Sequence, residues 1–93
     1  MKGITDKQEV FFQHLKYIQE LSVSLAMSES KKSSSLEELL YSVSYDAIYG
    51  FLELIDGYAP VEIKIDLIDK ETGMSLRKNV ELHDKCVDYL RSK

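Results

Sequence analysis

His83 and Cys86 form one candidate chemical pair in this chain. They are three positions apart, so on a helix both side chains could reach one metal ion or form a thiolate–imidazole pair. A structural zinc site needs four ligands, and the other histidine, His14, is distant in the sequence. No oxyanion hole or third orienting group is evident. We therefore expect no metal, no cofactor and no catalytic residue, with Cys86 acting as a small buried side chain and His83 at a boundary.

Carboxylates offer two further groupings. Asp66, Asp69 and Glu71 cluster around a predicted turn and could bind Ca²⁺. However, the segment lacks the D-x-[DN]-x-[DN]-G loop and the closing glutamate of a calcium site. Glu53 and Asp56 are three apart on a predicted helix and could face a substrate as a pair. We expect both groupings to be solvated.

The segment from Arg77 to His83 carries an arginine and a histidine separated by five residues. This spacing resembles the R-x₄₋₆-H motif of HEPN ribonucleases. The resemblance implies that the arginine and histidine of paired helices meet at a dimer interface and cleave RNA without metal. The predicted layout here differs from the all-helical layout of that family through a predicted β-hairpin, and Arg77 is expected before a helix and not within one. The ribonuclease is therefore kept as an alternative function.

Composition favours a protein partner over nucleic acid or a membrane surface. The chain has 93 residues, 44% hydrophobic and 30% charged, with sixteen acidic against twelve basic side chains and a net charge of −4. This length suits a single domain over residues 1–93, and the acidic balance disfavours nonspecific binding to nucleic acid or anionic lipid. One cysteine excludes an internal disulfide, and no secretory or membrane-spanning apolar run is present. We expect a cytoplasmic protein.

Two helices are predicted by apolar periodicity, over residues 6–27 and 36–56. Gly57 supplies a left-handed stop after the second helix. A polar, serine-rich loop over residues 28–35 lets the helices pack antiparallel. Each helix begins with a predicted capping box, formed by Thr5 with Gln8 and by Ser35 with Glu38.

Each helix has a predicted buried stripe. In the first it comprises Phe11, His14, Leu15, Ile18, Leu21, Ser22 and Leu25. We expect His14 to be packed there with one ring nitrogen hydrogen-bonded, where protonation would place a charge in the core. In the second helix the main stripe comprises Leu36, Leu39, Leu40, Val43, Ala47, Phe51 and Leu54. A narrow wedge is expected to be solvated, namely Glu38, Ser42, Asp46, Glu53 and Asp56. Gly50 is expected to allow another backbone to approach closely.

After Pro60 the apolar period changes from 3.6 to 2. Residues 61–67 are predicted as a half-buried strand, residues 69–73 as a turn and residues 74–77 as a short second strand. Residues 80–91 are predicted as a third helix. The expected fold class is therefore α+β in the order α-α-β-β-α. The free edges of a two-stranded hairpin would favour pairing with a second copy.

Tyrosines at four-residue spacing mark the second helix as a candidate interface. We predict partner-binding residues at Tyr41, Tyr45, Tyr49, Ile48 and Leu52. The alternative is that the rings lie under the first helix, the third helix or the hairpin. The sequence favours a noncatalytic protein-interaction module that forms a homodimer or binds another protein, such as an acidic inhibitor, antitoxin or immunity protein. The alternatives are the metal-independent ribonuclease using Arg77 and His83, and a structural subunit of a larger assembly.

Overall fold

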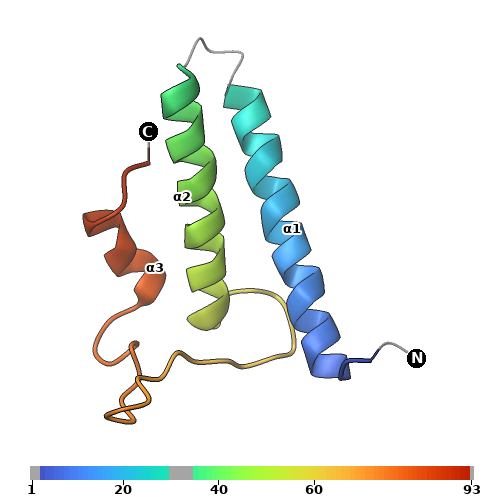
Figure 1. Cartoon of the computed structure of the whole chain (residues 1–93), viewed down its shortest axis with the longest axis vertical. Coiled ribbons are helices and arrows are strands. Elements are labelled where there is room, and N and C mark those ends of the chain that lie inside the picture. Colours follow the sequence, from blue (N-terminus) through green and yellow to red (C-terminus); the bar gives the residue numbers. More distant parts are fainter. Residues whose placement is uncertain (1–2, 30–34, 93) are drawn as a thin grey trace.

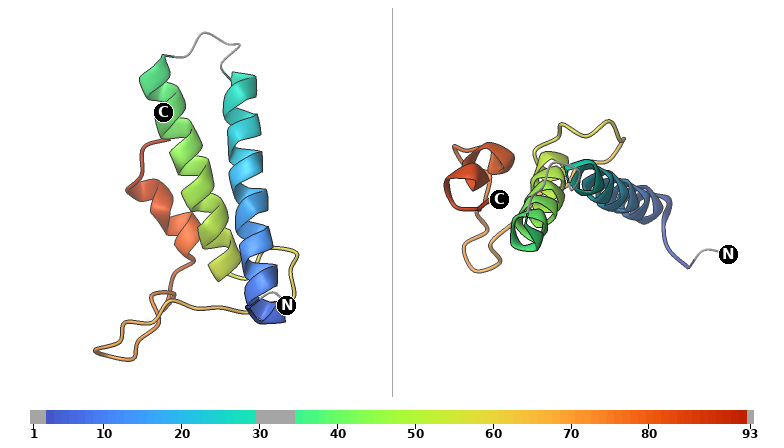
Figure 2. Two further views of the ribbon diagram at one scale, coloured as in Figure 1. Left: turned by 45° about the vertical axis from the view of Figure 1, so that its right-hand side comes forward. Right: turned by 90° about the horizontal axis from the view of Figure 1, so that it is seen from above.

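The computed structural model describes residues 3–29 and 35–92. Helix α1 (Asp6–Glu29) and helix α2 (Leu36–Ile55) run antiparallel, and a short C-terminal segment packs on the other side of α2 (Figure 1). That segment contains α3 (Leu82–Lys85) and a 3₁₀ turn, η2 (Cys86–Asp88). Seen from above, α3, α2 and α1 lie in a row (Figure 2). The helices therefore form one layer, in a molecule with extents of 44 × 38 × 21 Å.

The ends of both long helices follow the rules read from the sequence. The Gln8 backbone N–H donates to Thr5 Oγ1 at 3.1 Å, and the Thr5 N–H donates back to Gln8 Oε1 at 2.9 Å. The Ser35–Glu38 capping box forms in the same way. At the end of α2, Gly57 has φ +89°. The bonds from its N–H to the Leu54 carbonyl and from the next N–H to the Glu53 carbonyl complete a Schellman motif. Both predicted helices are confirmed, within two residues at each end.

The prediction of an α+β fold is wrong. Within residues 3–29 and 35–92 the structure has helices and no β-strand, and the predicted hairpin is reduced to one antiparallel bridge between Ile68 and Ser75. The turn itself forms, with the Asp69 N–H bonded to the Met74 carbonyl at 2.9 Å. Side chains take the donors that a ladder would use: Asp66 Oδ1 accepts from the Leu67 N–H. These local bonds compete with strand pairing.

The predicted third helix is also much shorter than expected. Asn79 adopts φ 63°, and the Val80 N–H bonds to the Arg77 carbonyl at 3.2 Å, which closes a tight turn. Glu81, the N-cap residue of α3, makes no side-chain cap bond. The chain therefore turns where the prediction began a helix, and only residues 82–88 are helical.

The two long helices pack through small and polar positions. A Cβ on Gly50 would lie 3.1 Å from Ile18 Cγ2, so the close neighbour of Gly50 is a side chain of α1 and not a backbone. Ser22 and Ser42 are buried between the helices, where Ser22 Oγ donates to the Ile18 carbonyl and Ser42 Oγ donates to Glu29. Buried apolar side chains in the described ranges are few: Ile18, Leu54, Ile55 and Ile63.

The expected faces of α2 are therefore wrong in part. Ser42 and Asp56, expected in the solvated wedge, are buried. Leu36 and Leu40, expected in the buried stripe, are 72% and 58% exposed. Because α1 packs on the small positions, the N-terminal part of the apolar stripe of α2 is left exposed, whereas Leu54 of the same stripe is buried. The serine-rich loop lies largely outside the described residues, since residues 30–34 are not described.

Candidate functional site

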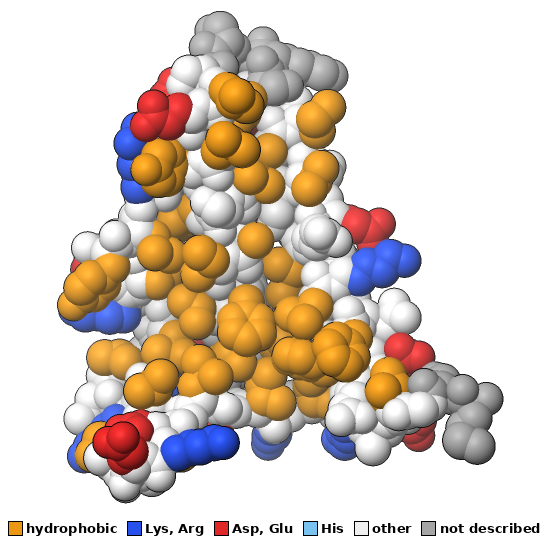
Figure 3. All heavy atoms as spheres, viewed as in Figure 1, with side chains coloured by type: hydrophobic (Ala, Val, Ile, Leu, Met, Phe, Trp, Pro, Cys, Tyr) orange, Lys and Arg blue, Asp and Glu red, His pale blue; other side chains and the backbone are white. Residues whose placement is uncertain are grey.

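The broad side of the helix pair is an apolar surface, which we call the α1/α2 face. It surrounds a groove between the helices that is lined by Leu15, Ile18, Gln19, Ser22, Val23, Val43, Ser44, Ala47 and Phe51. Helical spacing places Phe12 and Met27 of α1 and Leu36 and Leu40 of α2 on the same side, beyond the groove. Figure 3 shows apolar side chains across both helices, with charged side chains at the margins. None of the groove-lining residues is charged.

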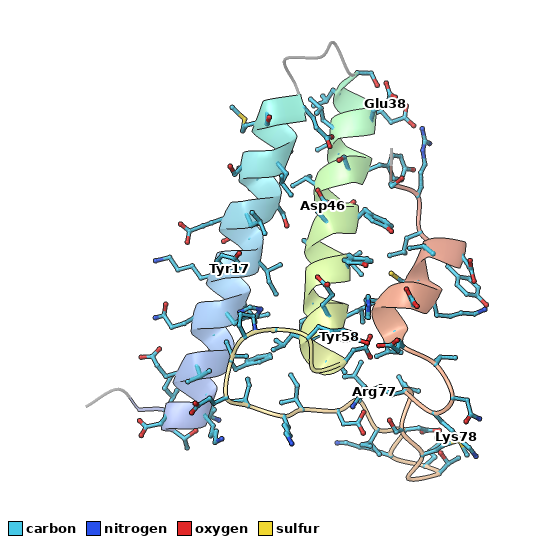
Figure 4. All side chains as sticks on the ribbon, turned by 180° about the vertical axis from the view of Figure 1, so that it is seen from behind. Tyr17, Glu38, Asp46, Tyr58, Arg77 and Lys78 are labelled. Carbon is cyan, nitrogen blue, oxygen red and sulfur yellow. The ribbon has the colours of Figure 1, made fainter. Side chains whose placement is uncertain are left out.

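Local packing explains why this face is open. Ile18 and Gly50 fix the contact between the helices, and helical geometry places Val43, Ala47 and Phe51 about 20°, 60° and 100° around α2 from Gly50. The extended segment after α2 passes behind the helix pair, on the side shown in Figure 4. The α1/α2 face consequently receives no covering element from the described parts of the chain.

The whole chain is less compact than its size predicts. Its accessible surface is 7097 Å², against about 5,500 Å² for a typical monomeric protein of this mass. Its radius of gyration is 15.4 Å, against about 12 Å for a compact domain of 93 residues. The single layer of helices contributes to this additional surface, because domains usually bury their apolar faces between two packed layers.

The tyrosines of α2 face the C-terminal segment. Tyr45 and Tyr49 are half-buried and stack with ring centroids 5.9 Å apart. Tyr49 meets the edge of the His83 ring at 5.4 Å, and the Arg91 guanidinium lies 4.3 Å from the centre of the Tyr41 ring. Burial raises the pKa of both half-buried tyrosines, with smaller contributions from nearby acidic groups.

Two apolar neighbours complete the predicted interface. Ile48 is exposed, and Leu52 is half-buried. The structure thus places all five predicted partner-binding residues on α2, where the tyrosines make intrachain contacts. Their role in binding a partner stays a prediction.

A buried carboxylate holds the C-terminal segment to the end of α2. The Asp56 side chain is fully buried, and its Oδ2 accepts from the His83 backbone N–H at 2.9 Å and lies 2.6 Å from His83 Nδ1. Arg77 Nε lies 3.3 Å from the other oxygen, Oδ1, and Arg77 Nη2 donates to the Asp56 carbonyl. One carboxylate therefore connects three segments of the chain.

The surroundings of this pair set its protonation. Burial would raise the pKa of Asp56, but hydrogen bonds from the backbone and side chain of His83 outweigh it, and the pKa of Asp56 is lowered. Burial likewise opposes protonation of His83, yet the hydrogen bond to Asp56 and its charge raise the pKa of the imidazole. A lowered pKa of Asp56 and a raised pKa of His83 both favour the charged form of the side chain, so the fold favours an ion pair between them.

The Asp56–His83 pair has part of the geometry of a catalytic dyad, because a carboxylate can orient an imidazole through Nδ1. The Cys86 thiol does not provide the nucleophile, since its Sγ donates to the His83 carbonyl at 3.2 Å and burial raises its pKa. Among the described residues, the imidazole has no hydrogen-bond partner other than Asp56. Its ring is enclosed by Tyr49 and Tyr58, which both meet it edge to face.

Sequence reasoning placed Asp56 in solvent and so missed this cluster. One signal could have found it. Asp56 is the C-cap residue of α2, where the helix dipole disfavours a negative charge. A carboxylate at that position is stabilised by nearby cationic side chains, and in this chain Arg77 and His83 are those side chains.

On the opposite side of the helix pair there is a second, more polar pocket of about 300 Å³. Tyr17, Asp46 and Tyr58 lie along it (Figure 4). His14, expected in the core, is half-buried in the wall of this pocket and packs on Tyr17 at 5.6 Å. Burial raises the pKa of Asp46, helped by the charge of Glu29. This pocket thus combines apolar, aromatic and acidic side chains, whereas the groove of the α1/α2 face has no charged lining residue.

Within residues 3–29 and 35–92, no group of three or more His, Cys, Asp and Glu side chains is placed to hold a metal ion. In the same ranges, no helix has the length and apolar character needed to cross a membrane. Comparison of the chain with protein-family models, curated proteins and solved structures gives no significant match.

Proposed function

We propose that this chain is a noncatalytic protein-interaction module and that the α1/α2 face is its binding surface. The observation that carries the proposal is the exposure of the large apolar side chains on this face, above all Leu36 at 72% and Met27 at 65%. Large contiguous apolar patches on a protein surface mark sites of association, because the contact of apolar side chains with water is unfavourable. The uncharged groove suits the apolar core of a protein interface.

If the partner is a protein other than a second copy of this chain, the acidic balance of the chain favours one class of partner. With a net charge of −4, a basic partner would be attracted and an acidic one repelled at the rim. An inhibitor, antitoxin or immunity protein that blocks a basic partner is one form that this module could take. A structural subunit of a larger assembly would use the same face.

Recovery of partners from an extract of the native cell tests the proposal. Leu40 and Leu76 are matched, since they are 58% and 54% exposed and only Leu40 belongs to the α1/α2 face. Tagged wild-type protein and Leu76→Glu should recover the same proteins, including untagged copies of this chain, and Leu40→Glu should lose them. If Leu40→Glu recovered every protein that wild type recovers, the α1/α2 face would not be the binding surface.

The ribonuclease alternative has less support. Its two residues do come together, and the all-helical structure removes one difference from the HEPN layout. However, the Arg77 guanidinium and the His83 imidazole both bind Asp56, so neither is free to contact a phosphate. A His83→Ala variant that lost an RNA-cleaving activity of the pure protein, while keeping its helical content, would revive this alternative.

A further inference from the structure

We infer that the occupant of the α1/α2 face is a second copy of this chain, bound about a two-fold axis that lies in the plane of the interface and perpendicular to the axes of α1 and α2. This inference rests on the proposed function and adds the identity of the partner. In the assembled dimer, α1 and α2 of one protomer cover α1 and α2 of the other. The result is a four-helix arrangement with the C-terminal segments outside it.

The single layer of helices is the first reason. A helix layer with one apolar side reaches a stable arrangement when a second layer covers that side. Figure 2 shows α1, α2 and α3 in one row. The first part of the segment that follows α2 crosses behind this row, and its later part runs below the ends of the helices toward α3 (Figure 1). A second copy supplies a layer of the same width and the same apolar character.

The shape of the face is the second reason. Met27, Leu36 and Leu40 project near the end where α1 finishes and α2 begins, and all three are strongly exposed. The groove lies further along the pair, and small side chains such as Ser22 and Ala47 contribute to its floor. A perpendicular two-fold axis would place the projecting end of each protomer over the groove of the other. The face is therefore complementary to itself in this antiparallel arrangement.

The available area is the third reason. The chain exposes about 1,600 Å² more than a monomer of its mass typically does, and a standard interface takes about 800 Å² from each partner. The additional surface, summed over the whole chain, is larger than the area that one partner gives to a standard interface. Charge does not oppose the contact, because two acidic chains would meet through a groove without charged lining residues. A lipid surface fits less well, since no Lys or Arg is among the lining residues to bind anionic headgroups.

Sedimentation equilibrium of the purified chain tests the inference. Wild type should have about twice the 10.7 kDa mass of one chain at micromolar concentration. Leu40→Glu and Leu36→Glu should each raise the dissociation constant by about 100-fold or more, because a symmetric interface contains every substitution twice. Leu76→Glu, the matched control outside the face, should stay dimeric.

If the chain folds only as a dimer, the face variants should unfold and would not remain as folded monomers. If the face variants unfold, the thermal midpoint of wild type should rise with protein concentration, as it does for an obligate dimer. A midpoint independent of concentration together with unfolded variants would overturn the inference. A monomeric wild type, or a dimer that persists in Leu40→Glu and Leu36→Glu, would also overturn it. A monomeric wild type would leave the proposed function standing, because that fails only if Leu40→Glu keeps its partners from the extract.

Discussion

Ile18 Cγ2 lies 3.1 Å from the place that a Cβ on Gly50 would occupy. The absence of a side chain on Gly50 therefore sets how closely α1 and α2 approach. It also determines which side of each helix is turned inward. With Ile18 against Gly50, the serines enter the contact and Leu36 and Leu40 of the apolar stripe of α2 stay exposed.

Replacing Gly50 with leucine should force the helices apart. We expect Gly50→Leu to lower the free energy of unfolding by about 1–3 kcal/mol, the usual range for overpacking a tight contact. Urea unfolding followed by circular dichroism would measure the loss. The double variant Ile18→Ala/Gly50→Leu should recover part of it, because truncating Ile18 makes room for the new side chain. Strictly additive losses would show that these residues do not form the contact that sets the helix spacing.

Removing the charge of Asp56 should release the C-terminal segment. Asp56→Asn leaves Arg77 and His83 without their counter-charge. We expect the free energy of unfolding to fall by about 2–3 kcal/mol, which is typical of a hydrogen bond to a charged group. Hydrogen exchange over residues 82–88 should accelerate. The control is Asp88→Asn, whose exposed pair with Lys85 should contribute less than about 1 kcal/mol. Equal effects of the two substitutions would contradict the anchoring role of Asp56.

The Asp56–His83 pair should also make stability depend on pH. The pKa of His83 is raised, so its contribution is fully present below the unfolded value of about 6.5 and is lost as pH rises through the higher folded value. The pKa of Asp56 is lowered, so its contribution is present above the unfolded value of about 3.9 and is lost as pH falls through the lower folded value. Arg77, Glu81 and Asp84 are the other charged groups around the pair.

The unfolding free energy of wild type should therefore exceed that of His83→Gln most strongly between about pH 4 and pH 6.5, which are the two unfolded pKa values. Urea unfolding of both proteins across pH 4 to pH 9 would measure the difference. It should shrink on the alkaline side. A difference that stays constant from pH 5 to pH 9 would mean that the imidazole does not act through its charge.

The sequence predicted the parts of this fold that local rules decide. Both long helices follow from capping boxes, apolar periodicity and the Gly57 stop, all of which act within a few residues. The prediction of a strand over residues 61–67 was wrong, because alternation of apolar and polar residues does not by itself form a sheet. Side chains such as Asp66 captured backbone donors, and the pairing ended at one bridge between Ile68 and Ser75.

The candidate site was less predictable, because it depends on which faces of the helices meet. Apolar area suggested that Leu36 and Leu40 would turn inward, whereas the close contact at Gly50 selected the serine side. The sequence did indicate that α2 has more apolar surface than the chain covers. It located that excess at the tyrosines, while the largest exposed aliphatic side chains of α2 lie on a different side of the helix.

The most direct test of the assembled α1/α2 face is the solvent exposure of its methyl groups in the pure protein. Relaxation of ¹³C-methyl signals by a dissolved gadolinium chelate reports that exposure for each leucine. In the single chain Leu40 is 58% exposed and Leu76 is 54% exposed, so without a partner the two should respond alike. If two copies assemble through the α1/α2 face, the Leu40 methyls should be strongly protected and the Leu76 methyls should not. Equal relaxation of the two leucines at concentrations where a dimer should form would contradict it.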